Sequence, residues 1–569
     1  MLVTSDNSER TSVTPYNSGH PKEKGFLNVQ HVHEDSDQDY YTDIEKADSP
    51  QKVVRGLQSR HIQLIALGSA IGTGLFIGSG GALSTCGPAP LFMAYIIISF
   101  FVWTIMNQLT EMVCLIPLPG EASIYSLTKT YMNSSISFMS GWNLFYAMAM
   151  IVPTEITACA LLIKYWTDAN SAIFITIFIV VSICLIMLPV RAFGESEFYV
   201  CTIKIVTIIG LIIIGIVIFF GGGPNQHHVL GFHYWKTPGA FQEHLASGST
   251  GKFLAVWTAI IKSGFSFVLV PETVTSCSAE CVMPRRNMPR ACQRFVYRLA
   301  VFYVLGTLII GVIVGSDNDR LINAIQSGKS DAAASPFVIG IQEVGIKVLP
   351  HIINACILTS AYSCGCALLF GSSRTIYAMA LKGDAPKIFG KVNRFGTPYY
   401  SVGAASLFTF LAYLNCSKSS SKVFNWLSNI ATISGFVSWI FVAATYLRFR
   451  RVMDILNLND RVPFRVPYQR AFAWATGIFF FILSLTNGYS VFISGNWNVS
   501  DFFAAYVTIG FIIVLFVIGT VYHREWKFRD PYEIETEILP KIAISDEEER
   551  NEVIPVPKNL WEKIVAFII

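Results

Sequence analysis

The apolar segment around residue 70 is interrupted by a run of small residues, GSAIGTG at positions 68–74. An intact transmembrane helix offers no free backbone dipoles, whereas this composition permits the helix to unwind and to expose consecutive N–H groups. Such amides, at the positive end of a half-helix, suit a substrate carboxylate. The alternative is close packing against a neighbouring helix, for which Gly68 and Gly72 have the small-xxx-small spacing. The motif alone leaves both interpretations open.

A second interruption lies in residues 264–272, GFSFVLVPE. Pro271 has no N–H, so we expect it to release the carbonyl of Phe267 from helical hydrogen bonding. A free carbonyl at membrane depth can accept a hydrogen bond from a substrate ammonium. The alternative is a simple proline kink, because transmembrane helices tolerate proline.

The composition around these two segments is that of a membrane protein. Of the 569 residues, 52% are hydrophobic and only 14% are charged, which is too few charges for an ordinary soluble enzyme of this size. A hydrocarbon core about 30 Å thick requires ~20 apolar residues per helix, and we find about twelve such stretches. They are residues 61–83, 91–117, 137–165, 172–188, 198–220, 253–278, 295–315, 336–380, 399–414, 423–447, 472–493 and 502–522. The sequence therefore predicts an all-α, polytopic membrane protein with twelve transmembrane helices.

The two interruptions fall in the first and the sixth stretches. If stretches one to five and six to ten form two inverted halves, these are corresponding positions, as is typical of a transporter with discontinuous helices. No repeat between the halves is visible in the sequence. The predicted 5+5 inverted repeat therefore rests on the interruptions alone.

The orientation follows from the distribution of cations, because Lys and Arg are retained on the cytoplasmic side. The loops after the sixth, eighth and tenth stretches are rich in Lys and Arg, whereas the loop after the seventh is poorer in them. Both termini are then expected in the cytosol. We predict a disordered cytosolic tail at residues 1–56, a membrane domain at 57–522 and a cytosolic C-terminal tail at 523–569. The end of that last tail is expected either to lie on the membrane or to fray.

Ionisable residues within apolar context form a second group of candidates, because each costs ~2.5 kcal/mol or more at the membrane centre. They are Glu111, Glu155, Lys204, Lys262 and Glu272. For Glu111 and Lys204 the alternative is snorkelling toward the membrane interface, since they lie away from the helix middle. For Glu155 and Lys262 the alternative is a structural ion pair. A buried carboxyl or amine of this kind could instead load and release a driving proton.

Other classes of protein fit the sequence poorly. The cations are scattered between apolar runs and form no basic face, which argues against nucleic acid as a partner. The histidines at 227, 228 and 233 lie in one loop and fit a solvated loop better than a metal site. The sequence contains neither a metal-spaced His pair nor a nucleophile elbow. We therefore expect no enzyme activity, no metal and no cofactor.

Several longer motifs closely resemble those of the fungal amino-acid permeases of the amino acid-polyamine-organocation superfamily. They are GLQSRHIQLIALG at 56–68, IGTGLF at 71–76, IKI at 203–205 and SSR at 372–374, and the resemblance covers residues 56 to about 522. Within the family, the chain is most similar to the proline-specific permeases, through PE at 271–272, SAEC at 278–281, HIINACILTSA at 351–361 and FNW at 424–426. General permeases usually have Gly-Thr before the glutamate of the sixth helix, where this chain has Val270 and Pro271. That departure favours proline over a broad or basic substrate range.

The resemblance implies a substrate site between helices one, three, six, eight and ten, and a proton symport in which Lys204 stands where sodium-coupled relatives place a cation. It implies that the substrate carboxylate is held by Ser69, Ile71, Gly72, Thr73 and Gly74. The carbonyls near Phe265 and Phe267 would take the ammonium, and the Phe265 ring would cover the substrate. Glu155 and Lys262 would shape the pocket, and Glu272 would join Lys204 in proton coupling.

The function expected from the sequence is proton-coupled import of proline across the plasma membrane. The alternatives are a permease for a wider range of small neutral amino acids and, in another class, an amino-acid sensor that does not transport. The expected partners are the substrate, protons and the lipid bilayer. Ubiquitin on the tail lysines Lys22, Lys24, Lys46 and Lys52 is a further candidate, as it is for any exposed tail lysine.

Overall fold

The structure is a computed structural model, and it describes residues 70–118, 120–276, 278, 281, 283–327, 335–393, 396–416, 420–493 and 495–551. Every element of regular secondary structure in these residues is helical. The all-α prediction is therefore confirmed. The predicted tail at 1–56, its lysines and Ser69 lie outside the described residues, as does the apolar end of the chain after residue 551.

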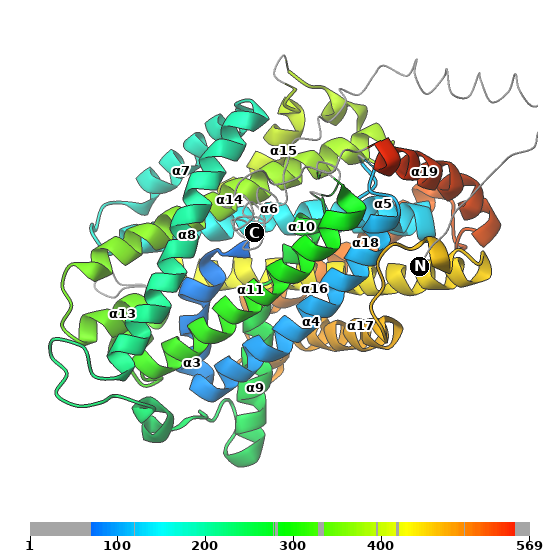
Figure 1. Cartoon of the computed structure of the whole chain (residues 1–569). Helices are drawn as coiled ribbons and strands as arrows, with labels where there is room; N and C mark the ends of the chain where they lie inside the picture. Colours follow the sequence, from blue (N-terminus) through cyan, green and yellow to red (C-terminus); the bar gives the residue numbers. More distant parts are fainter. Residues whose placement is uncertain are drawn as a thin grey trace, which may run out of the picture. The chain divides into compact units, whose positions relative to one another are not determined.

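Eight helices of the described chain are long and apolar enough to cross a membrane (Figure 1). They are α4 (Pro88–Leu115), α6 (Ser134–Ile163), α8 (Val190–Phe219), α11 (Pro284–Ile313), α14 (Leu349–Leu381), α16 (Ser420–Ile455), α17 (Gln469–Thr486) and α18 (Val499–His523). Each coincides with one of the predicted stretches. The chain is therefore a multi-pass membrane protein.

The other predicted stretches fall on helices that are short or interrupted. The first continues as η1 (Gly74–Gly78) and α3 (Ser79–Cys86), and the sixth is divided into α9 (Gly248–Gly264) and α10 (Val270–Ser276). The fourth is α7 (Ser171–Met187), and the ninth changes from α15 (Tyr399–Thr409) to the 3-10 helix η5 (Phe410–Cys416). The number twelve stays a prediction.

The predicted eighth stretch is wrong at its start. Residues 336–380 form two helices, α13 (Pro336–Glu343) and the long α14, rather than one. Gly345 separates them with a φ of +85°, a conformation that a residue without Cβ adopts at little cost.

The remaining helices connect or cap the others, and all of them except α19 are short. They are α5 (Ile124–Tyr131), α12 (Asp319–Ser327), α19 (Pro531–Asn551), η2 (Trp235–Gly239), η4 (Lys387–Gly390), η6 (Asn459–Arg461) and η7 (Tyr489–Phe492). Of these, α19 lies in the predicted C-terminal tail. It buries Ile534, Ile538 and Ile542, which share one face because they are spaced by four residues.

The helices differ in how much they bury. In the most apolar part of α6, 89% of the residues are buried, against 28% in α8 and α18. The latter two expose large apolar side chains such as Val206 and Val521, which is what a lipid-facing helix requires. α6 packs against both α14 and α16, and α4 runs beside α11 (Figure 1). The candidate residues on α6 therefore lie inside the bundle.

Candidate functional site

The first helix is interrupted at Ile71 and Gly72, as the sequence predicts. These two residues form a bend between Ala70 and Thr73, after which the chain is helical again. The Ile71 carbonyl accepts a hydrogen bond from the Ser360 hydroxyl at 2.9 Å, and the Tyr303 hydroxyl lies 2.8 Å from the Ala70 carbonyl. Side chains of α14 and α11 thus take over the hydrogen bonding that the helix gives up.

A carboxylate is bound at the start of the resumed helix, and it belongs to the protein. Both the backbone N–H and the hydroxyl of Thr73 donate to Glu155 Oε1, at 3.3 and 3.1 Å. Glu155 projects from the middle of α6 and is only 2% exposed. Its second oxygen, Oε2, is buried and receives no N–H or O–H hydrogen bond from the described residues. The Thr73 N–H therefore binds a carboxylate, as expected, but in this conformation the carboxylate is that of Glu155 rather than that of a substrate.

The glycines of this segment also allow close packing. A Cβ on Gly72 would lie 2.7 Å from Glu155 Oε1 and 2.9 Å from Cys364 Sγ. A Cβ on Gly74 would lie 2.6 Å from the backbone Cα of Ser266. A bend and close packing therefore occur together at Gly72, while Gly68, the other glycine of the predicted small-xxx-small pair, lies outside the described residues.

The second interruption lies within the predicted segment 264–272, but before Pro271 rather than at it. α9 ends at Gly264, residues 265–269 form turns, and α10 begins at Val270. Leu269 has a φ of +62°, which is uncommon for a residue with a side chain. Pro271 is the second residue of α10, where a missing N–H costs little. The prediction that Pro271 releases the Phe267 carbonyl is wrong, because that carbonyl accepts a hydrogen bond from the Val270 N–H at 3.2 Å.

The two interruptions meet around Tyr303 of α11. Its hydroxyl lies 2.8 Å from the Ala70 carbonyl and 3.0 Å from the Ser266 carbonyl, and its single proton can serve either one. The Ser266 hydroxyl in turn lies 2.6 Å from the Tyr95 hydroxyl of α4. This arrangement places one broken helix directly against the other.

The two phenylalanines of the second interruption have different surroundings. Phe267 is fully buried, with its ring centroid 4.7 Å from that of Tyr303. Phe265 is half-buried, and its ring meets that of Phe424 on α16 edge to face at 5.9 Å. Of the two rings, only that of Phe265 is partly exposed.

Lys262 and Glu272 lie on either side of the second interruption and contact different helices. The Lys262 ammonium donates to the Gly81 carbonyl at 3.1 Å and to the Thr85 hydroxyl at 3.0 Å, both on α3. The buried Glu272 accepts a hydrogen bond from Ser438 of α16 at 2.8 Å. The ion pair between Lys262 and Glu155 that the sequence offered as an alternative is not formed.

Lys204 is fully buried in the bundle, so the snorkelling interpretation is wrong for it. Its Nζ lies 3.9 Å from Glu197 Oε1. Glu197 is 3% exposed and also accepts a hydrogen bond from the Ser363 hydroxyl of α14. Sequence reasoning missed Glu197 because it lies in a polar stretch, GESEF at 194–198, just before the predicted helix. Its spacing of about two helical turns from Lys204 was the available signal.

Glu111 is also buried rather than snorkelling. One carboxylate oxygen accepts the Tyr446 hydroxyl at 2.7 Å, and the other accepts the Val466 N–H at 2.8 Å. Arg450 lies 3.9 Å away. These contacts join α4 to α16 and to the segment before α17, so Glu111 holds helices together.

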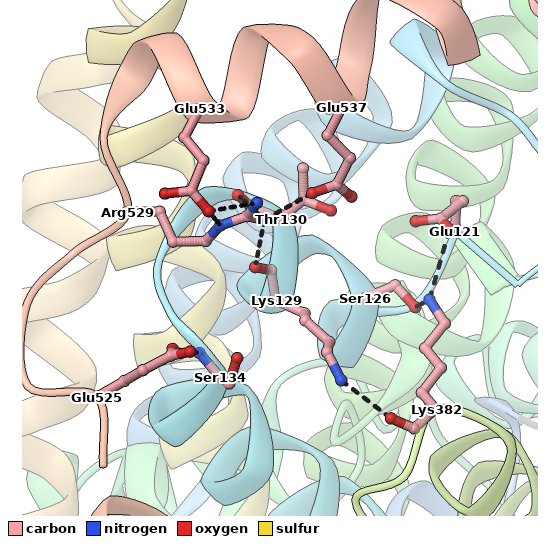
Figure 2. A pocket seen from close by; sticks show the side chains of 10 residues that line it. All are labelled: Glu121, Ser126, Lys129, Thr130, Ser134, Lys382, Glu525, Arg529, Glu533 and Glu537. Carbon is pink, nitrogen blue, oxygen red and sulfur yellow. Dashed lines mark hydrogen bonds and ion pairs between the residues drawn. The ribbon is translucent and has the colours of Figure 1, made fainter. Parts of the chain in front are cut away.

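A second polar region lies apart from the interruptions, where α5, the end of α14 and the segment from 525 to α19 meet. Figure 2 shows a pocket there of about 420 Å³. Arg529 pairs with Glu533 and Glu537, and Lys382 donates to the Ser126 hydroxyl at 2.8 Å. The charges that line this pocket are thus largely paired with one another.

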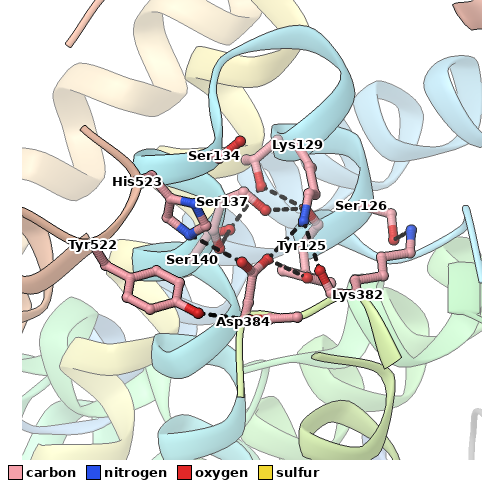
Figure 3. A network of polar contacts seen from close by, with 12 residues as sticks. Tyr125, Ser126, Lys129, Ser134, Ser137, Ser140, Lys382, Asp384, Tyr522 and His523 are labelled. Atoms are coloured by element: carbon pink, nitrogen blue, oxygen red, sulfur yellow. Dashed lines mark hydrogen bonds and ion pairs between the residues drawn. The ribbon is translucent and has the colours of Figure 1, made fainter. Parts of the chain in front are cut away.

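Asp384 is the centre of a network beside this pocket (Figure 3). Its buried carboxylate lies 3.0 Å from both Lys129 Nζ and His523 Nε2, and it accepts the Tyr125 hydroxyl. The Trp142 indole donates to its carbonyl at 3.2 Å. The network ties α5, α6 and the end of α18 to the loop after α14, which the cation pattern places in the cytosol.

The described residues contain no group of three or more His, Cys, Asp or Glu side chains that could hold a metal ion.

Comparison with known proteins gives a consistent result. A model of the amino acid permease family matches residues 61–531. The proline-specific permease of Saccharomyces cerevisiae is 49% identical, with 85% of this chain and 79% of that one covered. A probable proline-specific permease of Schizosaccharomyces pombe is 47% identical (88% and 90% covered), and the proline-specific permease of Emericella nidulans is 44% identical (90% and 93% covered). The matched region contains every motif that carries the resemblance from residue 61 onward.

Proposed function

Because the chain belongs to the amino acid permease family, we propose that it imports proline across the plasma membrane together with protons. The choice of proline is supported by the similarity to proline-specific permeases of three fungi over most of their length. It is also supported by Val270 and Pro271, which replace the Gly-Thr of general permeases. A permease family is a family of transporters, so we propose no enzyme activity.

The observation that carries this proposal is the meeting of two interrupted helices inside the bundle. One interruption binds a carboxylate through the Thr73 N–H and hydroxyl. The other supplies the turn at 265–269 with the half-buried Phe265 ring. An amino acid presents a carboxylate, an ammonium and a side chain, and these are the groups that such a pair of breaks can bind.

The contact between Thr73 and Glu155 gives a physical reason for proton coupling. A substrate carboxylate that uses the Thr73 N–H must displace the Glu155 carboxylate or share the site with it. Two like charges in one buried site repel each other strongly, and a proton on Glu155 removes that repulsion. Binding of the substrate and binding of a proton would then favour one another.

We retain the remaining site residues as part of the proposal. The substrate carboxylate would be held by Ser69, Ile71, Gly72, Thr73 and Gly74, and the ammonium and ring by Phe265 and Phe267. The pocket wall would be formed by Glu155 and Lys262. The proton-coupling groups would be Lys204 and Glu272. For Phe267 the contribution is its backbone and its packing on Tyr303, since its ring is buried.

The proposed topology has twelve helices in a 5+5 inverted repeat, with both termini in the cytosol. Helix contacts support it. The helices at corresponding positions of the two halves pack on each other, namely α3 on α9, α4 on α11 and α6 on α14. This pairing is expected when a two-fold axis passes between the halves. We place the tails at 1–56 and 523–569 in the cytosol, the first as a candidate for ubiquitin.

A test of the function uses the purified full chain in lipid vesicles. An inward-directed proton gradient should drive uptake of labelled proline above its equilibrium level, and unlabelled proline should compete better than alanine or other small neutral amino acids. Equal competition by those amino acids would favour the broader permease. Binding without counterflow would favour a sensor. Uptake that ignores the gradient would contradict proton symport.

A further inference from the structure

Glu197 is a buried carboxylate that the transport site described above does not use. We propose that Glu197 is the proton acceptor for Lys204, and that it passes the proton toward the cytosolic end of α8. This inference rests on the proposed function, because it requires a proton that moves with the substrate.

The first support is the burial of the pair. Lys204 is 0% exposed and Glu197 is 3% exposed, and the two charged atoms lie 3.9 Å apart. A charge without water around it is costly unless a partner neutralises it. A lysine sealed in this way can exchange its proton only through a neighbouring group. Glu197 is the carboxylate within ion-pair distance.

The second support is the position of Glu197 along α8. It lies about two turns closer to the start of the helix than Lys204, and the proposed topology places that start in the cytosol. Its neighbours Glu195 and Ser196 are exposed. Glu197 is therefore about 10 Å nearer than Lys204 to the end of α8 that the proposed topology places in the cytosol.

The third support is a connection from this pair to the substrate site through α14. The Ser363 hydroxyl donates to Glu197 Oε1. The next residue, Cys364, lies against the first interruption, where a Cβ on Gly72 would be 2.9 Å from its Sγ and 2.7 Å from Glu155 Oε1. Adjacent residues of one helix thus touch both carboxylates.

The titratable groups around Glu197 on the packed elements are few. Among the described residues they include Lys204 on its own helix, the thiols of Cys364 and Cys366 on α14, and the Glu155 carboxylate of α6, which interacts with both Lys204 and Cys364. The Cys366 thiol also contacts the Ser182 hydroxyl of α7 at 3.4 Å. Lys204 is the only cation in this set, so it is the group from which Glu197 would take a proton.

The proposed step is a simple transfer. One N–H bond of the Lys204 ammonium breaks, and an O–H bond forms on Glu197, which leaves a neutral amine and a neutral carboxylic acid. No further reactant is needed. Loss of the Glu197 proton to the cytosol then restores the carboxylate that the Ser363 hydroxyl stabilises.

The test compares exchange with coupled accumulation in vesicles that contain the full chain. Proline counterflow at equal pH on both sides requires substrate binding and alternation but no net proton transfer. Accumulation driven by a pH gradient requires substrate binding, alternation and also net proton transfer. We expect Glu197→Gln to keep counterflow near the wild-type rate while accumulation falls by about 100-fold, a typical contribution of a proton-transfer group. Glu197→Asp should restore part of the accumulation.

The matched control is Glu195→Gln, which removes an exposed carboxylate two residues away and should change neither measurement. Accumulation by Glu197→Gln at the wild-type level would overturn the inference. So would loss of counterflow in both Glu197→Gln and Glu197→Asp, because that result assigns Glu197 to holding the fold. If the wild-type protein itself shows counterflow but no gradient-driven accumulation, the proposed symport fails, and the two failures are thereby distinguished.

Discussion

Glu111 and Glu155 are both buried carboxylates within apolar helices, yet their hydrogen bonding differs. Each oxygen of Glu111 accepts a hydrogen bond, from Tyr446 and from the Val466 N–H, and Arg450 lies nearby. Glu155 accepts two hydrogen bonds from Thr73 on one oxygen and also contacts the Cys364 thiol, while Oε2 receives no hydrogen bond from an N–H or O–H group of the described residues. A carboxylate with hydrogen bonds on both oxygens gains nothing by changing partners, whereas one with an unbonded buried oxygen can gain a hydrogen bond by doing so. The comparison indicates a structural role for Glu111 and supports the proposal that Glu155 acts in transport.

The largest effect is expected on stability, from Glu111→Ala. The change leaves the Tyr446 hydroxyl, the Val466 N–H and the Arg450 guanidinium without their acceptor. Removing one member of such a buried charged group costs about 3 to 5 kcal/mol. Thermal unfolding in detergent should show a much lower Tm, and the protein that remains folded should keep its KM for proline. A wild-type Tm with a raised KM would reverse the assignment. The Tm of Glu111→Gln should fall less, because the amide oxygen keeps a hydrogen-bond acceptor at this position.

A smaller effect, on transport rather than stability, is expected from Glu155→Gln. The amide cannot exchange a proton, and loss of a proton-transfer group typically lowers a rate by about 100-fold, so we expect a fall of that size in uptake. The Tm should stay near the wild-type value because the side chain keeps its shape. An unchanged uptake rate together with an unchanged pH profile would show that Glu155 is as structural as Glu111.

Gly72→Ala should weaken uptake by a steric route. The added Cβ would approach Glu155 Oε1 to 2.7 Å and Cys364 Sγ to 2.9 Å, and relief of such overpacking typically costs about 1 to 3 kcal/mol. Gly81→Ala is the control, because a Cβ there meets no other atom within 4 Å. If both variants transport equally well, close contact at Gly72 is not required.

The smallest effect is expected outside the membrane, where Glu537 forms half-buried ion pairs with Arg529 and Lys541. Burial raises the pKa of Glu537, but hydrogen bonds and charges from Lys541 and Arg529 outweigh it and hold the pKa below its usual range. The carboxylate therefore stabilises the docking of α19 above about pH 4.3, and this contribution disappears as the pH falls through the lowered value. Glu537→Gln should loosen α19 by about 0.2 to 1 kcal/mol at pH 7.

Hydrogen exchange of residues 531–551 measures this last effect. Exchange should be faster in Glu537→Gln at pH 7 and should equal that of the wild-type protein in acid. Glu547→Gln, an exposed carboxylate on the same helix, is the control. Equal exchange in the two variants at pH 7 would show that the apolar face of α19 alone holds it in place.

Much of this arrangement can be predicted from the sequence because it is local. Apolar length marks the long helices, and the glycines at 68–74 mark the first interruption. The segment 264–272 contains the second interruption, but the break is at 265–269 and is not caused by Pro271. Its position depends on contacts from other helices, such as those of Tyr303 with the Ser266 carbonyl and of Phe436 with Gly264. A local signal cannot show them.

The partners of the buried charges could not be predicted for a similar reason. Glu197 is buried where α8 packs on α14, and the polar sequence around it does not indicate this burial. Likewise, Glu155 could be placed in a helix but not matched to Thr73. The isoleucines at 534, 538 and 542 did carry a helical signal, which the many charges around them obscured.

Proton uptake upon proline binding tests the central claim most directly, namely that a substrate carboxylate and Glu155 compete for the Thr73 N–H. The measurement uses the purified full chain in weakly buffered detergent solution, with a pH-sensitive dye and saturating proline. The account predicts an uptake of about one proton per bound proline near neutral pH, and almost none in Glu155→Gln that still binds proline. Equal uptake by the two proteins, or binding by the wild-type protein without any uptake, would contradict it.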